Sequence, residues 1–304
     1  MISVTPRKFS PIHLIFILAL IFFCNICVAD SKINAVKSQA TIGILWEISK
    51  ENIAPSYVFG TVHSEDERVT ELPIPVIKQF NESKTFVLEM LLDNKNTNEI
   101  FKKMYFSNGD TLQSVIGDDL YQQSVKAIKD KGFPIDVLKR MKPWAVFTIL
   151  NMPEQKTGLF MDVLLFKQAQ TQSKIIRALE TQQEQTAVFD DMPMASQVSL
   201  LKSTLDDLDN IDSTLEELIA VYLERDLDKL MKISKKYEET IDKAIVKDFN
   251  QRLIINRNHR MVKRMLPMLR DGYCFVAVGA LHLPGEDGIL TLLTKQGYQV
   301  RAVY

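Results

Sequence analysis

The spacing of apolar positions changes twice along this chain and divides it into three stretches. In residues 41–90, short β-branched and aromatic runs alternate with Pro and Gly. From about residue 94 to residue 271, apolar residues mostly recur at helical spacing. Residues 273–303 return to short apolar runs. Strands that alternate with helices at both ends predict an α/β fold.

The predicted strands share a β-rich composition and are bounded by Gly, Pro or charged residues. They lie at residues 42–48, 57–59, 85–88, 174–179, 273–278 and 299–303. Helices are expected at 76–83 and 285–295. We therefore expect one central mixed sheet, built from N- and C-terminal βαβ-type halves, with a large helical insertion of which residues 185–271 form an arm or cover.

The first residues have the pattern of a secretory signal peptide. Arg7 and Lys8 precede an apolar run at 12–23, and small residues end at Ala29 before a polar stretch. We predict cleavage after Ala29, which gives a signal peptide at 1–29, a mature domain at 30–304 and a periplasmic location. The alternative is an uncleaved anchor, because 12–29 approaches the length of a membrane-spanning helix. Contact with a membrane is expected only through this segment.

Charge and cysteine content narrow the possible classes of function. The chain has 37 basic and 38 acidic residues, a formal net charge of −1, and no basic stripe with interleaved aromatics. Nucleic acid is therefore not an expected partner. Cys24 and Cys27 would leave with the signal peptide, so Cys274 alone would remain and a disulfide framework is excluded.

The candidate chemistry lies directly after the predicted strands. A Gly-x-x-His motif follows two of them and ends at His63 and His282, while Glu89 and Glu180 follow two others. Ligands of open α/β sheets bind outside the carboxyl ends of the strands, where these side chains would meet. Imidazole and carboxylate suit a divalent ion such as Mn, Co or Zn, or acid–base chemistry without one.

Each of these residues also has a structural interpretation. A histidine after one strand is commonly a hydrogen-bonded structural residue, and Glu89 alone would more often cap a helix or lie at the surface. Glu180, next to Glu184 and several glutamines, resembles an ordinary solvated helix start. The duplication of the motif is what favours a site. No Gly-x-Ser-x-Gly, His-Glu-x-x-His, Walker or Gly-x-Gly-x-x-Gly motif occurs.

Seven segments, in order along the chain, resemble the TraB/GumN (Tiki-like) family, which is distantly similar to erythromycin-esterase and ChaN-type proteins. They are FGTVH at 59–63, LPIPV at 72–76, FVLEM at 86–90, KPW at 142–144, ALETQQEQ at 178–185, NRNHRM at 256–261 and VGALHLPGEDGILTLLTKQGYQV at 278–300. The resemblance implies that the two motifs face each other and that His63, Glu89 and His282 form the active centre.

The resemblance also implies divalent-metal proteolysis, as described for Tiki-type members. Arg257 and Asn258 match an Arg-Asn pair of the family; Arg257 either polarises a substrate or forms a salt bridge. The family often has an acid two places after the glycine equivalent to Gly158, where this chain has Phe160 and then Asp162. This departure puts in doubt any role for the loop.

Three functions remain open from the sequence. In the first, an exported hydrolase cleaves a peptide or protein substrate: His63, Glu89 and His282 hold a metal ion, and Glu180 transfers a proton. In the second, the same pocket of a periplasmic protein binds a peptide or haem without catalysis. In the third, a metal-free esterase-like site uses one histidine as general base, oriented by Glu89.

Overall fold

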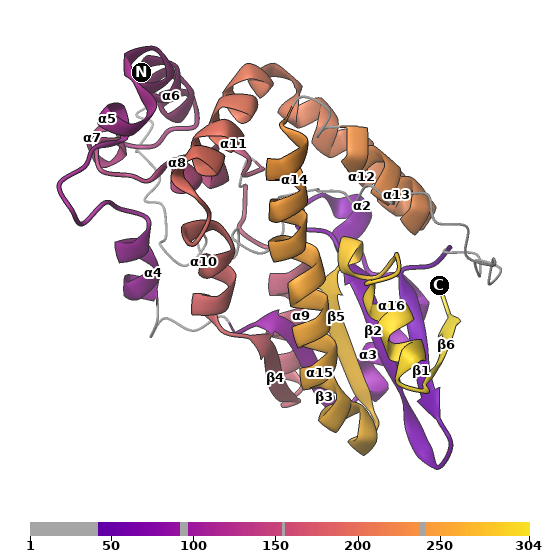
Figure 1. The fold of residues 1–304 in the computed structure, drawn as a ribbon. Coiled ribbons are helices and arrows are strands. Elements are labelled where there is room, and N and C mark those ends of the chain that lie inside the picture. The colour runs from indigo at the N-terminus through magenta and orange to yellow at the C-terminus, as the bar shows by residue number, and fades with distance from the viewer. Residues whose placement is uncertain (1–41, 92–96, 154–155, 237–240) are drawn as a thin grey trace.

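The computed structural model describes residues 42–91, 97–153, 156–236 and 241–304. The predicted signal peptide at 1–29, with its cleavage site and the start of the mature domain, lies outside these residues. Within them, no helix combines the length and apolarity needed to cross a bilayer. The fold is the expected α/β class, with a mixed sheet and many helices (Figure 1).

The sheet has six strands in the order β4-β3-β5-β2-β1-β6. Their bounds are β1 Leu45–Lys50, β2 Ile53–Thr61, β3 Thr85–Met90, β4 Ile175–Glu180, β5 Cys274–Gly279 and β6 Gln299–Ala302. The neighbours β4, β3, β5 and β2 are parallel, whereas β1 is antiparallel to both β2 and β6. The C-terminal β5 lies between two N-terminal strands, which confirms that both ends of the chain build one mixed sheet.

The strand bounds differ from the prediction in ways that concern the site. β2 begins at Ile53, because β1 and β2 form a hairpin around Asn52, whose φ is 61°. β3 and β4 each extend through the glutamate that was expected to follow them. Glu89 and Glu180 are therefore strand residues, held in place by the ladder.

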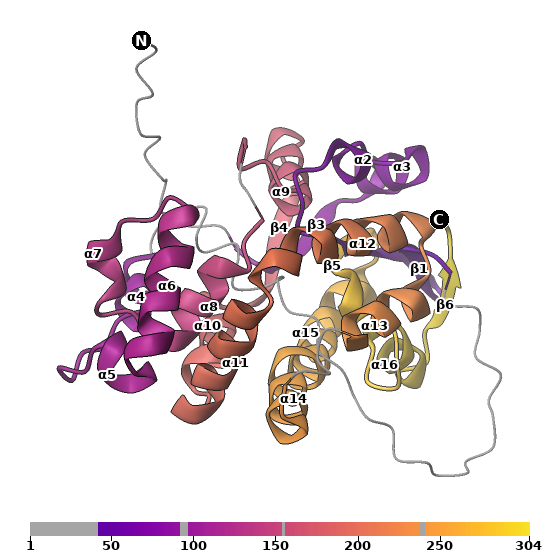
Figure 2. The ribbon, with the colours of Figure 1, turned by 90° about the horizontal axis from the view of Figure 1, so that it is seen from above.

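Helices cover both faces of the sheet (Figure 2). One face carries α2 Glu67–Thr70, α3 Ile74–Glu82 and α9 Met161–Thr171; the other carries α13 Leu227–Lys236, α15 Asn256–Asp271 and α16 Ile289–Lys295. In Figure 1, α12 Ile211–Glu224 lies above the carboxyl ends of the parallel strands. The Tyr222 hydroxyl of α12 donates to the Gly60 carbonyl over 2.8 Å, which ties this helix to the end of β2.

The remaining helices form a lobe with a core of its own, seen at the left of Figure 1. They are α4 Thr97–Lys103, α5 Leu112–Ile116, α6 Asp118–Asp130, α7 Ile135–Leu138, α8 Pro143–Leu150, α10 Gln182–Asp190 and α11 Met194–Asp206, joined by α14 Lys243–Asn250. The described part of the predicted cover at 185–271 is mainly helical, but its helices do not pack together: α11 packs on α8 of the lobe, and α15 packs on the sheet.

Candidate functional site

The two Gly-x-x-His motifs lie next to each other at one edge of the sheet. β2 and β5 are parallel neighbours, with Thr61 paired to Gly279. His63 follows two residues after this last pair and His282 follows three residues after it. Both imidazoles are buried, at 4% and 3% exposure. The ladder therefore brings to one sheet edge two histidines that are more than two hundred positions apart in the chain.

The glycine of the first motif permits a close approach to the second. A Cβ atom on Gly60 would lie 3.0 Å from Ala280 Cα and 2.8 Å from Leu283 Cδ1. Real Cβ contacts are rarely this short, so a side chain here would displace the segment that carries His282. The glycine of the first motif is therefore needed for the close packing of the two motifs.

We expect a Gly60→Ala variant to lose about 1–3 kcal/mol of unfolding free energy, as is typical when a packed site is overfilled. Urea unfolding followed by circular dichroism measures the loss. The same change should cost less in a chain that also carries Ala280→Gly, because the Ala280 Cβ, which would lie 3.1 Å from the new methyl group, is then absent. A single variant as stable as the wild type would contradict the close packing of the two motifs.

Glu89 connects the end of β3 to the second motif. Its Oε1 accepts the Gly279 N–H over 2.7 Å and lies 3.8 Å from His282 Nε2, while Oε2 accepts Arg257 Nη2 over 2.6 Å. Burial raises the pKa of Glu89 above its usual value, and the Arg257 charge opposes that shift. The result is a buried carboxylate beside an imidazole.

His282 is held in one tautomer by Asn258. Its Nδ1 lies 2.6 Å from Asn258 Oδ1, and the Asn258 amide nitrogen donates to the Asp287 carbonyl over 2.8 Å. Because that amide nitrogen is engaged, the Asn258 oxygen is the atom that accepts the Nδ1 proton. Burial, aided by the Arg257 charge, lowers the pKa of His282 well below its usual value. A neutral ring with Nε2 as its acceptor atom faces Glu89.

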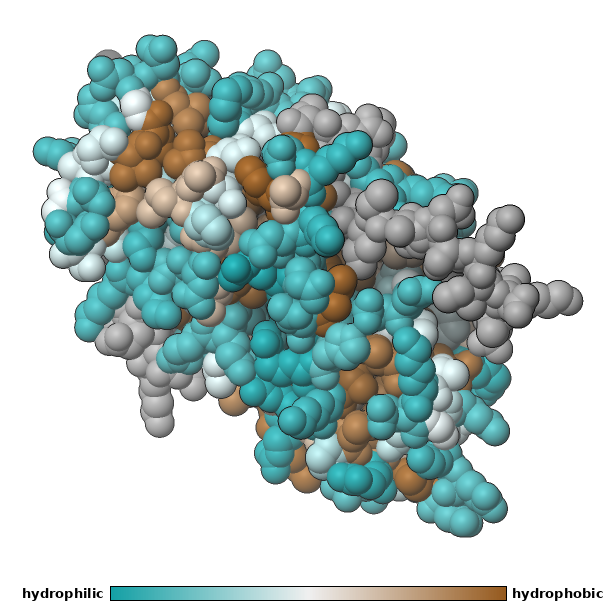
Figure 3. Space-filling view, viewed as in Figure 1, coloured by the Kyte–Doolittle hydropathy of each residue, from teal (hydrophilic) through white to brown (hydrophobic). Residues whose placement is uncertain are grey.

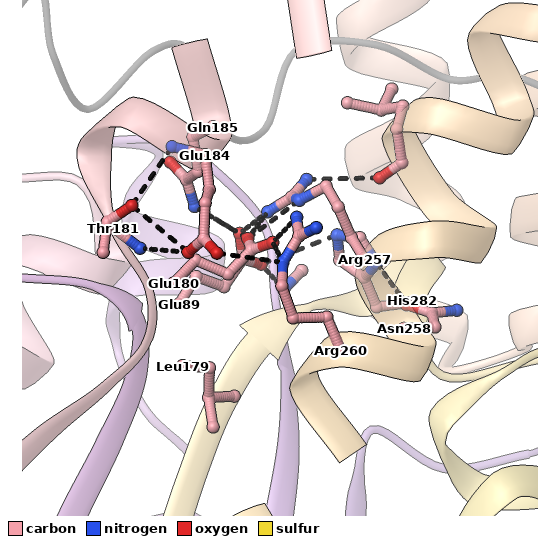
Figure 4. Close-up of polar contacts among 12 residues, drawn as sticks. Glu89, Leu179, Glu180, Thr181, Glu184, Gln185, Arg257, Asn258, Arg260 and His282 are labelled. Atoms are coloured by element: carbon pink, nitrogen blue, oxygen red, sulfur yellow. Dashed lines mark hydrogen bonds and ion pairs between the residues drawn. The ribbon is translucent and has the colours of Figure 1, made fainter. Parts of the chain in front are cut away.

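The expectation that Glu180 is a solvated residue at a helix start is wrong. Glu180 is buried at the end of β4 and accepts hydrogen bonds from Arg257 and Arg260 (Figure 4). The helix-start role belongs to Thr181 and Glu184, which form a capping box on α10. Because both oxygens of Glu180 are engaged by guanidinium groups, its pKa is lowered despite its burial, and the geometry does not favour proton transfer.

Arg257 bridges the two glutamates. Its side chain is 1% exposed, with Nη2 2.6 Å from Glu89 Oε2 and 2.7 Å from Glu180 Oε2. Its Nη1 donates to the Leu253 carbonyl over 3.3 Å, within the π-helical turn 251–255 that precedes α15. Of the two interpretations of Arg257 from the sequence, these contacts correspond to the salt bridge.

These polar groups are buried because they lie where the sheet core meets the core of the helical lobe. In β3, Leu88 belongs to the first core and Met90 to the second, with Glu89 between them. The face along α14 and α15 is mainly hydrophilic (Figure 3). His259, on α15, is exposed and lies 2.8 Å from Asp287.

The first histidine has partners that were not predicted from the sequence. His63 Nδ1 lies 3.4 Å from Asp162 Oδ2, and the Phe160 ring stacks on the imidazole at 4.0 Å between centroids. The loop whose role was in doubt from the sequence thus contacts His63 directly. Asp162 was visible in the sequence, but its spacing from Gly158 differed from the family pattern. Gln185, which donates to both Glu89 and Glu180, was also missed.

The donor types fit a divalent metal ion, although no ligand cluster is assembled. Across the four described ranges, no three His, Cys, Asp or Glu side chains gather closely enough to hold an ion. Both His63 and His282 nevertheless place Nδ1 against a side-chain oxygen, so that Nε2 is the atom suited to a metal, as in many metal sites. With Glu89 they supply the imidazole and carboxylate donors that Zn and Mn accept.

Comparison with known proteins finds a matching family model and several relatives. The sequence model of the TraB/PrgY/gumN family matches residues 44–302. "Metalloprotease TIKI2" of Xenopus tropicalis is 24% identical over 87% of this chain and 60% of its own length. "Metalloprotease TIKI1" of Homo sapiens is 24% identical over 91% of this chain and 63% of its own. The chain thus spans less than two thirds of these relatives. No solved structure matches it.

Proposed function

The chain belongs to the TraB/PrgY/gumN family, and we propose that it is a divalent-metal-dependent hydrolase that cleaves peptide bonds in a peptide or protein substrate. The observation that carries the proposal is the buried pair of His282 and Glu89, with Nε2 3.8 Å from Oε1 and the ring oriented by Asn258. The relatives named metalloproteases support the same chemistry. From the N-terminal pattern we also propose export and a periplasmic location.

His63, Glu89 and His282 would hold the ion. When bound, a divalent ion supplies a Lewis acid that polarises a peptide carbonyl and acidifies water. His282 contributes a neutral ring, because a lowered pKa keeps its Nε2 lone pair available. All three side chains are buried, which limits competition from bulk water for these ligand atoms.

Glu89 would also move the proton of the reaction. Its Oε1 lies 3.8 Å from His282 Nε2, so a carboxylate stands next to one of the atoms that would face the ion. Arg257 and the Gly279 N–H hold both of its oxygens in fixed positions. We assign Glu180 to orienting Arg257, because its own oxygens are occupied by arginines.

Metal content tests the proposal. The purified wild-type chain should contain about one divalent ion, and His63→Ala and His282→Ala should each reduce the content to background while the fold is retained. His259→Ala is the matched control, since His259 is exposed and contacts Asp287 instead. Mass spectrometry of the protein measures the ion, and circular dichroism checks the fold. Wild-type protein without metal after incubation with Mn, Co or Zn would overturn the proposal.

Peptide cleavage separates hydrolysis from binding. Incubation with a peptide pool should generate new peptide termini, and a chelator should stop their formation. Saturable binding of haem or peptide without new termini would favour the non-catalytic alternative. Cleavage that is insensitive to the chelator would favour the metal-free site.

A further inference from the structure

The loop before α9 is fastened to the segment that carries His63. The Glu65 carboxylate accepts the backbone N–H groups of residues 156–158 over 2.7–3.2 Å, and the Met161 N–H donates to the Ser64 carbonyl over 3.2 Å. These bonds join two parts of the chain that are about ninety residues apart. They bring the first turn of α9 against the imidazole.

Asp162, in that first turn, contacts two residues of the first Gly-x-x-His motif, one with each carboxylate oxygen. Its Oδ1 accepts the Thr61 hydroxyl over 2.7 Å, and its Oδ2 lies 3.4 Å from His63 Nδ1. The Phe160 ring is stacked on His63 with an angle of 13° between the planes. Stacking fixes the plane of the imidazole, and the carboxylate fixes which edge of the ring faces α9.

The arrangement repeats, with other residues, what Asn258 does for the second histidine. In both cases a side-chain oxygen that can accept a proton faces Nδ1, an arrangement that favours the Nδ1–H tautomer of a neutral ring. We propose that Asp162 is a positioning residue that holds His63 in its Nδ1–H tautomer and so presents Nε2 as the metal-binding atom. Only the metal-binding role of Nε2 rests on the proposed function, because the tautomer of His63 can be measured in the metal-free protein.

The tautomer of His63 is the decisive measurement. Long-range ¹H–¹⁵N NMR of the chelator-treated, histidine-labelled protein should show His63 protonated at Nδ1 in the wild type. Asp162→Ala should lose that preference, because the acceptor is removed. Asp162→Asn should retain most of it, since its amide oxygen can face Nδ1 while its amide nitrogen donates to the Thr61 hydroxyl.

Metal affinity is the second measurement. Titration with Mn²⁺ and Zn²⁺ by calorimetry should give about 10- to 100-fold weaker binding for Asp162→Ala, the usual effect of losing the partner of a metal-binding histidine. Asp190→Ala is the matched control: its side chain is similarly exposed, at 13% against 16%, and holds Lys142 in the helical lobe. It should change neither the tautomer nor the affinity.

The outcomes separate this inference from the proposed function. An unchanged Nδ1–H tautomer of His63 in Asp162→Ala would overturn the inference, whatever the metal affinity. A changed tautomer in a protein that binds no metal even as wild type would support the role of Asp162 and refute the metal site. Should Asp162→Ala fail to fold, Thr61→Val is the second variant, because it removes the buried hydroxyl that donates to Asp162. It should weaken the preference of His63 for the Nδ1–H tautomer. An unchanged preference would count against the inference.

Discussion

An Arg257→Met variant should lose about 3–5 kcal/mol of unfolding free energy, the effect expected when one partner of a buried ion pair is removed. Arg257 is almost completely buried and lies between Glu89 and Glu180, at 2.6 and 2.7 Å. Methionine fills similar volume without charge, so the loss would come from two buried carboxylates deprived of their shared cation. Urea unfolding followed by circular dichroism measures it.

Two further variants identify the cause of that loss. Arg264→Met removes an arginine from the same helix whose side chain is 40% exposed and which pairs with Glu184. It should cost less than about 1 kcal/mol, because solvent screens that pair. Adding Glu180→Gln to Arg257→Met should recover part of the loss by removing a buried charge. An Arg257→Met variant as stable as Arg264→Met would show that the contacts of Arg257 with Glu89 and Glu180 do not stabilise the fold.

The local sequence pattern was sufficient to predict one mixed sheet and the placement of His63 and His282 at its carboxyl edge. A strand followed by Gly-x-x-His is readable over a few residues, and parallel strands place their carboxyl ends on one edge. The strand order, with β5 inserted between β2 and β3, was not predicted and comes from the structure. The likeness to erythromycin-esterase and ChaN-type proteins and the metal-binding roles of His63, Glu89 and His282 remain predictions.

Contacts between distant segments could not be read in the same way. Glu180 looked solvated because its neighbours Gln182, Glu184 and Gln185 are polar. In the structure Gln182 and Gln185 are buried with it, at the junction between the two cores. A polar run can therefore mark a buried junction as well as a surface, and only the approach of Arg257, 77 positions away, distinguishes them.

Asp162 shows the same limit from the other direction. Its distance from Gly158 differed from the family pattern, and this difference counted against the loop. The structure shows that the helix start, with Asp162 in the first turn of α9, is what meets His63. Fixed spacing along the chain is a weaker guide than the side of an element on which a residue lies.

Glu89→Gln should reduce peptide hydrolysis by about 10²- to 10⁴-fold, the range expected for loss of a general base, and should also weaken metal binding. Glutamine has nearly the same shape, so the neighbouring backbone need not move. One oxygen, however, becomes an NH₂ group that cannot accept hydrogen bonds, so either the Gly279 N–H on the Oε1 side or Arg257 and Gln185 on the Oε2 side lose their acceptor. The unsatisfied donor should cost about 1–3 kcal/mol of stability.

The matched control is Glu184→Gln, which changes a carboxylate at the start of α10 that pairs with Arg264 rather than facing His282. It should leave peptide cleavage and metal content at wild-type levels. Cleavage rates with excess Mn or Zn, together with metal content and urea unfolding of both variants, distinguish a lost proton acceptor from a lost fold. If Glu89→Gln cleaved peptides as fast as the control, Glu89 would be a structural partner of Arg257, and the reaction would need another base.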